Sequence, residues 1–371
     1  MYSIQTIVGT TMREYSFPLV EERSGQVGVS KIIPRERVKA AFNFEETDIV
    51  PYDLAIEPEV QERLSRHYGG DDWENSIEKH FVQVIFPSEM DFINGSCFRD
   101  EYGCVWDVRA LPMHLVESPI KEPSLKGYDF DSVRRKILSM FNEDTARLII
   151  DENQDKFILG YVGSSLFETS WKLRGFENAL VDCALHPAFY EELLDCILEL
   201  QLSMVDKICE FPVDAVFLGD DWGDQRGIII GPERWRRFLK PRFRKLFERV
   251  RQHGKMVMMH CCGNAFEVIP DVIEIGLDLL ESLQPEAMDV YEIKRRYGRN
   301  IRLWGGLGTQ QVLPFGTPED VRNEIRRLIA EMGAGGGYIL ASAKPLMKEV
   351  PTENAITVIE EFSRQRSRET S

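Results

Sequence analysis

The sequence predicts a single (β/α)8 barrel, an α/β fold in which eight parallel strands alternate with helices. The chain has 371 residues, which is long for one ordinary domain and normal for one such barrel. From residue 156 onward, β-prone segments alternate with helical patterns, as in a parallel sheet. Each β-prone segment stops at small or polar residues, as expected of loops around a ligand. An open doubly wound sheet is the alternative, weakened because no tight Gly-x-Gly-x-x-Gly opens a helix.

The N-terminal part is predicted to be an arm followed by the start of the barrel. Residues 1–34 lack clear periodicity and contain turn-forming glycine and proline, so we expect an extended arm that contributes to contacts in a homo-oligomer. Residues 35–371 are expected to form the barrel. Within its first part we predict a helix over 35–44, a strand over 49–55, a helical region over 56–90 with Trp73 and Phe81 in the core, and a strand near 90–94.

A short insertion and a regular alternation complete the predicted barrel. The segment FRDEYGCVWDVR, residues 98–109, has a Tyr-Gly turn between β-prone flanks and predicts a hairpin beside the barrel. The later strands are predicted at 156–163, 215–220, 256–260, 279–283, 301–304 and 337–341. The helices between them are predicted at 189–210, 232–253, 266–274, 290–297, 318–332 and 352–364.

Composition and charge exclude several classes of partner. The formal net charge is −16, which disfavours nucleic acid and anionic membranes, and no apolar run reaches the roughly 18 residues of a membrane span. The N-terminus has no basic start followed by an apolar block, so no secretion signal is expected. The seven cysteines are odd in number and lack the spacing of a disulfide framework, which favours a reducing cytoplasm.

Polar residues gather where the predicted strands end, which is where barrels of this class carry their chemistry. His260 and Cys262 follow one strand, and alternation of side chains puts both on one side with Cys261 on the other. Zinc accepts nitrogen and sulfur ligands, so this pair is a candidate metal site, although a buried histidine among small thiols is the structural alternative. The other strand-end candidates are Ser164, Asp220, Asp221, Gln225, Glu281, Gln284, Glu286, Trp304 and Lys344.

Three of these candidates also have structural interpretations. Asp220 and Asp221 follow an apolar run between Gly219 and Gly223, which favours a functional role, although consecutive acids also cap helices or lie solvated in loops. Trp304 precedes two glycines and fits either a pocket wall or the core. We expect both aspartates to line the same pocket as His260, because the strands they follow should be neighbours in the barrel.

Several of these segments together resemble the uroporphyrinogen decarboxylase superfamily, and within it the corrinoid-dependent (methylcobamide:thiol) methyltransferase branch. The resemblance runs from about residue 35 to the C-terminus, and the similar segments follow in family order. They are RERVKAAFNFEETDIVPYDL, RDEYGCVWD, GDDWGDQRG, HCCGN, LWGGLGTQQVLPFGTPEDV, GGGYILA and VPTENA. The superfamily's fold is a (β/α)8 barrel, in agreement with the strand count.

The resemblance implies a function and roles for the strand-end residues. In the methyltransferase branch, a His-x-Cys pair supplies two ligands of a catalytic zinc that binds a thiol substrate as thiolate, and the thiolate attacks a methyl-corrinoid held on a partner protein. His260 and Cys262 match that pair. Asp220, Asp221 and Lys344 are then expected to be catalytic. Ser164, Gln225, Gln284 and Trp304 are expected to bind the small-molecule methyl acceptor.

The third zinc ligand departs from the family pattern, because Lys344 stands where the branch places another ligand. A protonated lysine has no free lone pair for zinc. Three alternatives follow. In the first, an acid such as Glu281 or Glu286 completes the zinc site, and Glu281 is expected because it lies on the next strand. In the second, the site no longer binds zinc, and in the third, Lys344 binds a substrate carboxylate.

Two other functions stay open at this point. One is decarboxylation of a porphyrinogen or smaller acid, with Asp220 or Asp221 stabilising a developing cation. The family's Arg-Gln-Ala-Gly-Arg-Tyr block, which grips the carboxylates of the porphyrinogen, is not found in residues 13–37. The other is a non-catalytic barrel that binds a corrinoid or a corrinoid protein, which the missing third ligand would explain.

Overall fold

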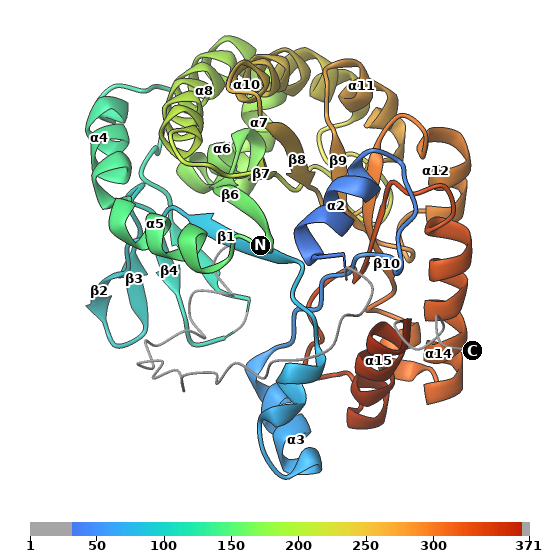
Figure 1. Cartoon of the computed structure of the whole chain (residues 1–371). Helices are drawn as coiled ribbons and strands as arrows, with labels where there is room; N and C mark the ends of the chain where they lie inside the picture. The colour runs from blue at the N-terminus through green and yellow to red at the C-terminus, as the bar shows by residue number, and fades with distance from the viewer. Residues whose placement is uncertain (1–31, 111, 366–371) are drawn as a thin grey trace.

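The centre of the molecule is a curled parallel sheet with helices on its outer side (Figure 1). The computed structural model describes residues 32–110 and 112–365, so the predicted arm lies almost entirely outside the described residues. The seven strands pair in the order β1-β6-β7-β8-β9-β10-β11, and all these pairs are parallel. They are β1 (Phe81–Ile85), β6 (Phe157–Ser164), β7 (Ala215–Gly219), β8 (Met256–His260), β9 (Leu279–Leu283), β10 (Arg302–Leu307) and β11 (Tyr338–Ser342).

The predicted strand at 49–55 pairs with β11 at a single point. Tyr52 forms a parallel bridge with Leu340, where the Asp53 amide donates to the Leu340 carbonyl at 3.0 Å and the Leu340 amide donates to Pro51 at 2.9 Å. In the described part of the chain, the parallel sheet is therefore a half-barrel of seven strands with a bridged segment at its β11 edge. The α/β class is confirmed, while the eight-stranded closure stays a prediction.

Two predictions in the N-terminal part were wrong. The helical region expected over 56–90 contains α3 (Pro58–Tyr68) and the short 3₁₀ helix η1 (Asp72–Ser76), and then β1 of the parallel sheet. Residues 91–94, expected to be a barrel strand, instead form β2 of a separate antiparallel sheet. The run Phe-Val-Gln-Val-Ile of β1 is five residues long and apolar except for Gln83, and such a run fits a buried strand or a piece of helix equally well.

The predicted hairpin is confirmed and is part of a larger insertion. Its two strands pair in antiparallel register, with Phe98 opposite Trp106, and two more strands extend them to a four-stranded sheet in the order β2-β3-β4-β5. This sheet stands beside β1 (Figure 1). The strands are β2 (Asp91–Asn94), β3 (Cys97–Arg99), β4 (Val105–Asp107) and β5 (His114–Glu117).

The helices after residue 187 follow the predicted pattern closely. Amphipathic periodicity fixes their length and their buried face, so the ends of all of them except the short α13 (Val312–Phe315), which was not predicted, lie within two residues of the predicted ones. The other helices before residue 187 are α2 (Pro34–Phe42), α4 (Phe130–Met140), α5 (Glu143–Glu152), α6 (Leu166–Arg174) and α7 (Phe176–Leu185). The later ones are α8 (Pro187–Cys209), α9 (Pro232–Arg234), η2 (Trp235–Leu239), α10 (Lys240–Gln252), η3 (Phe266–Val268), α11 (Ile269–Glu274), α12 (Val290–Tyr297), α13 (Val312–Phe315), α14 (Pro318–Arg327), η4 (Leu328–Met332) and α15 (Thr352–Arg364).

Alternation along the strands divides the core into an inner and an outer layer. In β7, Val216 and Leu218 belong to the large cluster between the sheet and its helices, whereas Phe217 belongs to a smaller cluster inside the curled sheet. Helix α2 contributes Phe42 to this inner cluster, and its ring stacks on Phe157 at 5.3 Å. The inner space is thus packed at the end where α2 lies, which leaves the carboxyl ends of the strands for a site.

Two general predictions concern the whole chain. Within the described residues, no helix combines the length and apolarity that a membrane crossing requires. All seven cysteines are free thiols, as the spacing predicted.

Candidate metal centre

His260 faces the inside of the curled sheet at the carboxyl end of β8. The side chains of Val257, Met259 and Cys261 pack in the outer cluster, so the alternation turns Met258 and His260 inward. In the parallel register, His260 lies opposite Glu281 of β9. The two inward side chains meet: the His260 Nδ1 atom and the Glu281 Oε2 atom form a short hydrogen bond.

The loops after β7 and β8 touch backbone to backbone. The Asn264 amide donates to the Asp224 carbonyl at 2.7 Å. Gly263 has φ +75°, and a Cβ there would lie 2.5 Å from the Gly223 carbonyl carbon and oxygen. Likewise, a Cβ on Gly223 would lie 2.8 Å from the Cys262 carbonyl oxygen. Glycine at both positions therefore allows the close approach.

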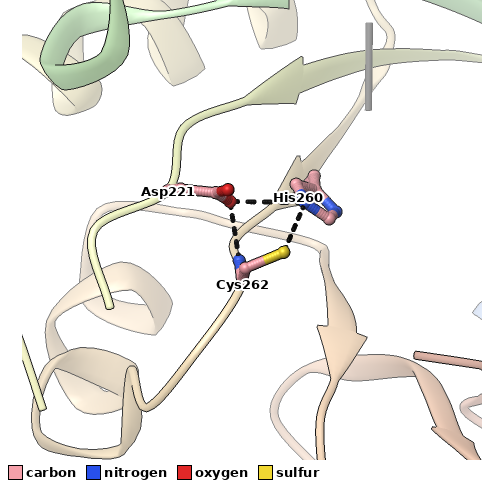
Figure 2. Close-up of side chains that lie close together, drawn as sticks. All are labelled: Asp221, His260 and Cys262. Carbon is pink, nitrogen blue, oxygen red and sulfur yellow. Dashed lines mark hydrogen bonds and ion pairs between the residues drawn. The ribbon is translucent and has the colours of Figure 1, made fainter. Parts of the chain in front are cut away.

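This approach joins Asp221 to His260 and Cys262 (Figure 2). The Cys262 amide donates to Asp221 Oδ1 at 2.8 Å, and His260 Nε2 lies 3.3 Å from the same oxygen. His260 Nε2 lies 3.2 Å from Cys262 Sγ. One nitrogen, one sulfur and one oxygen atom thus lie within 4.8 Å of one another, and all three can point at one ion.

Burial and neighbouring charges shift the pKa values of His260 and Asp221 in opposite directions. Burial alone would lower the pKa of His260, but the charges of Glu281 and Cys262 and the hydrogen bond to Asp221 raise it well above its usual value. Burial alone would raise the pKa of Asp221, whereas the hydrogen bond and the charge of His260 hold it far below its ordinary range. A positive charge is therefore favoured between these groups, whether it is a proton or a metal ion.

The donor set fits zinc. Three protein ligands of nitrogen, sulfur and oxygen type with one position left open are typical of catalytic zinc. The hydrogen bond to Glu281 occupies Nδ1 of His260 and leaves Nε2 for the metal, as in other metal-bound histidines whose far nitrogen meets a carboxylate. Glu281, which we predicted as the third ligand, thus lies on the far side of the ring from the ligand atoms, and Asp221 is the acid beside them.

Asp220 has a different environment from its neighbour. Its side chain is fully buried and accepts hydrogen bonds from the Phe167 and Glu168 amides at the start of α6 and from Trp222 Nε1. Burial and the charge of Glu168 raise the pKa of Asp220 to about 8. These contacts tie α6 to the β7 loop, and neither Asp220 nor Asp221 is among the described residues that line the cavity with His260. Its catalytic role stays a prediction.

The predicted substrate-binding residues do not gather in one place. Ser164 and Trp304 line a cavity at the open end of the sheet together with His260. Gln284 accepts a hydrogen bond from the Gly263 amide and so supports the metal loop, whereas Gln225 reaches Gln310 at 3.5 Å on the exposed side.

The two remaining candidates are Lys344 and Glu286. Lys344 is half-buried in the segment after β11, and among the described residues it forms no ion pair. Glu286 accepts from the amides of Gln310 and Gln311 through Oε1 and is not part of the metal cluster.

The cavity contains acids that sequence reasoning missed. Its volume is about 780 Å³, and it lies between the half-barrel and the antiparallel insertion. Asp53 comes from the bridged segment, Asp100 and Glu101 from the turn after β3, and Lys172 from α6. The adjacent acids before the Tyr-Gly turn were a visible signal, but the sequence does not show that the insertion folds over the strand ends.

The structure is an α/β fold with a cluster of His260, Cys262 and Asp221 at the carboxyl ends of parallel strands. The chain belongs to the uroporphyrinogen decarboxylase (URO-D) family, whose model matches residues 136–365. The resemblance seen in the sequence motifs is therefore confirmed.

The relatives of this chain include proteins named for two different activities. The chain is 22% identical to a methylated-thiol–coenzyme M methyltransferase of Methanosarcina mazei over 51% of this chain and 48% of that protein. It is 21% identical to a uroporphyrinogen decarboxylase of Neisseria meningitidis serogroup C over 56% of this chain and 60% of that protein. The match thus spans about half to three fifths of the length of these relatives. A solved methyltransferase from Methanosarcina mazei shares the fold, with a TM-score of 0.67 and 18% identity over 92% of this chain and all of the other.

Proposed function

We propose that this protein is a methyltransferase that moves a methyl group between a corrinoid carried by a partner protein and a small-molecule thiol or related acceptor. The observation that carries the proposal is the convergence of His260 Nε2, Cys262 Sγ and an Asp221 carboxylate oxygen within 4.8 Å. These three atoms would hold a zinc ion, which would bind the acceptor thiol as thiolate and lower its pKa. The similarity to a methylated-thiol methyltransferase supports the same chemistry.

The chain's own residues have separate tasks in this proposal. Glu281 accepts a hydrogen bond from the Nδ1–H group of His260 and so fixes the ring with Nε2 toward the other two ligand atoms. Asp221 is held by the Cys262 amide, which keeps its carboxylate beside the thiolate. One thiolate and one carboxylate would balance the charge of a dication, and the position left open would take the acceptor thiol.

The decarboxylase alternative is less well supported by the cavity. Five carboxylates line it, from Asp53, Glu89, Asp100, Glu101 and Glu281. Among the described lining residues, Lys172 is the single lysine or arginine. A polycarboxylate such as a porphyrinogen would meet like charge there.

An assay with free methylcobalamin in place of the corrinoid protein tests the proposal. The zinc-loaded protein is expected to methylate 2-mercaptoethanol, and Cys262→Ser is expected to lose roughly a hundredfold or more of this rate, because the thiolate ligand is gone. Cys261→Ser is the matched control: its sulfur lies next in the chain but packs outward, where it accepts from the Trp222 amide at 3.4 Å. Methylated thiol is measured by mass spectrometry.

Other outcomes would replace the proposal. Release of carbon dioxide from uroporphyrinogen without thiol methylation would establish the decarboxylase instead. Tight binding of the corrinoid with no turnover of either substrate would establish a non-catalytic binding barrel. Equal activity in Cys262→Ser and in the parent would remove the metal from the mechanism.

A further inference from the structure

We propose that the small molecule entering the cavity is an organic cation, an ammonium compound bearing methyl or other alkyl groups, held by Asp53 and a wall of aromatic rings. The proposal rests on the proposed function, since it names the charge class of the substrate at that same site. It differs from the anionic or neutral acceptor that the metal chemistry alone would permit.

The residues that line the cavity carry more negative charge than their own ion pairs and hydrogen bonds neutralise. Glu89 forms an ion pair with Lys136, and Glu281 is bonded to His260. Lys172 is the one lysine or arginine among the described lining residues, and its Nζ donates to Ser164 Oγ. Five carboxylates therefore face one lysine and one histidine.

The two acids after β3 are largely satisfied by the insertion itself. Asp100 accepts from the amides of Tyr102 and Cys104 and from Trp106 Nε1, and Glu101 accepts from the Glu89 amide. Asp53 lies outside the insertion, and its carboxylate accepts a hydrogen bond from the Leu54 amide.

Asp53 occupies the position where a cation would be most stabilised. Within the described residues, no lysine or arginine forms an ion pair with it, and the charge that acts on it is that of the Glu281 carboxylate. Burial and that like charge raise the pKa of Asp53 to about 6. A positive group bound between Asp53 and Glu281 would relieve this repulsion.

Aromatic rings form the wall beside these acids. Trp304 stacks on Phe81 with ring centroids 4.4 Å apart and on Phe217 at 6.1 Å, and Tyr161 lies 5.6 Å from Phe217. Of these four, Tyr161, Phe217 and Trp304 line the cavity. Ring faces attract alkylammonium groups, and recognition of such cations by clustered aromatic rings with a nearby acid is a general binding mode.

The two sets of groups together select one ligand class. The rings contact the alkyl groups, and the carboxylates attract the positive charge of the ammonium group. A neutral ligand would contact only the rings, and an anion would be repelled by the carboxylates. The volume of about 780 Å³ suits a small molecule, with space left beside His260 for a reacting group.

Calorimetric titration with choline and with 3,3-dimethylbutan-1-ol, its uncharged carbon isostere, tests the proposal. Choline is expected to bind at least about tenfold more tightly, because the two probes share shape and differ in charge. Asp53→Asn should reduce the preference severalfold or more. Asp91→Asn, which removes the same charge from exposed strand β2, is the control and should leave it unchanged.

The pH dependence gives a second readout. Choline affinity is expected to rise as pH increases through about 6, because Asp53 gains its negative charge there, and Asp53→Asn should flatten this rise. The other titratable groups that share the cavity are Glu281, His260, Glu89, Asp100, Glu101, Tyr102, Tyr161 and Lys172. Loss of a proton from any of them makes the cavity more negative, so none reverses the sign.

Two outcomes would overturn the proposal: equal affinity for choline and its isostere, or tighter binding of the anionic thiol 2-mercaptoethanesulfonate than of choline. The titrations are repeated on Cys262→Ser, which lacks the proposed metal ligand but retains Asp53 and the rings. A preference for choline that survives in this variant supports the cation site even if methyl transfer fails. The failures of the two proposals are therefore distinguishable.

Discussion

Asp221→Asn is expected to lower the affinity for zinc by roughly a hundredfold or more, since loss of a supporting group outside the ligands already costs 10–100-fold. The amide keeps an oxygen that can accept from the Cys262 amide, so the loop should retain its conformation and the melting temperature should stay near the parent's. Zinc affinity is measured by competition with a chromophoric chelator. Methyl transfer should fall with it.

The control for this change is Asp224→Asn in the same loop. Asp224 is exposed, and its Oδ1 accepts from the amides of Arg226 and Gly227, which an asparagine oxygen can also do. This variant is expected to bind zinc like the parent. Retention of full zinc affinity in Asp221→Asn would mean that another donor, such as Glu281 after a ring flip of His260, completes the site.

Gly263→Ala is expected to abolish zinc binding through the backbone. A Cβ at this position would lie 2.5 Å from the Gly223 carbonyl group, and φ of +75° is unfavourable for alanine. The loops after β7 and β8 must then separate, which moves Cys262 away from Asp221. The free energy of unfolding should fall by about 1–3 kcal/mol, measured by urea denaturation, together with the zinc content.

Gly254→Ala is the control that distinguishes backbone strain at positive φ from a steric clash of the new Cβ atom. Gly254 has φ of +69°, but a Cβ there meets no atom within 4 Å. This control should lose stability through the same backbone strain and should still bind zinc. If both variants lose zinc equally, global destabilisation rather than the contact between the two loops governs the metal site.

Much of the site's framework could be predicted because strand alternation is a local property. The pattern from Met256 to Cys262 placed His260 inward and Cys261 outward, and the structure has both. The neighbouring strands also made the meeting of His260 and Glu281 foreseeable. Which nitrogen of the ring Glu281 contacts could not be foreseen, because this depends on a side-chain rotation.

The acid beside the ligand atoms could not be predicted from strand order. Asp221 reaches Cys262 because Gly223 and Gly263 let two loops touch, and such a contact has no periodic signature. The strand β1 was misassigned for a related reason: a run of five residues, four of them apolar, is too short to distinguish a strand from a helix turn. The acids Asp100 and Glu101 belong to an insertion whose position over the cavity is a tertiary property.

An anomalous difference map at the zinc absorption edge, from crystals grown with one equivalent of zinc, tests the central claim most directly. One peak per chain is expected, roughly 2.0–2.3 Å from His260 Nε2, Cys262 Sγ and a carboxylate oxygen of Asp221. A map with no peak at these three atoms, or with its peak at Glu281 or elsewhere on the chain, would contradict the assignment of the metal centre.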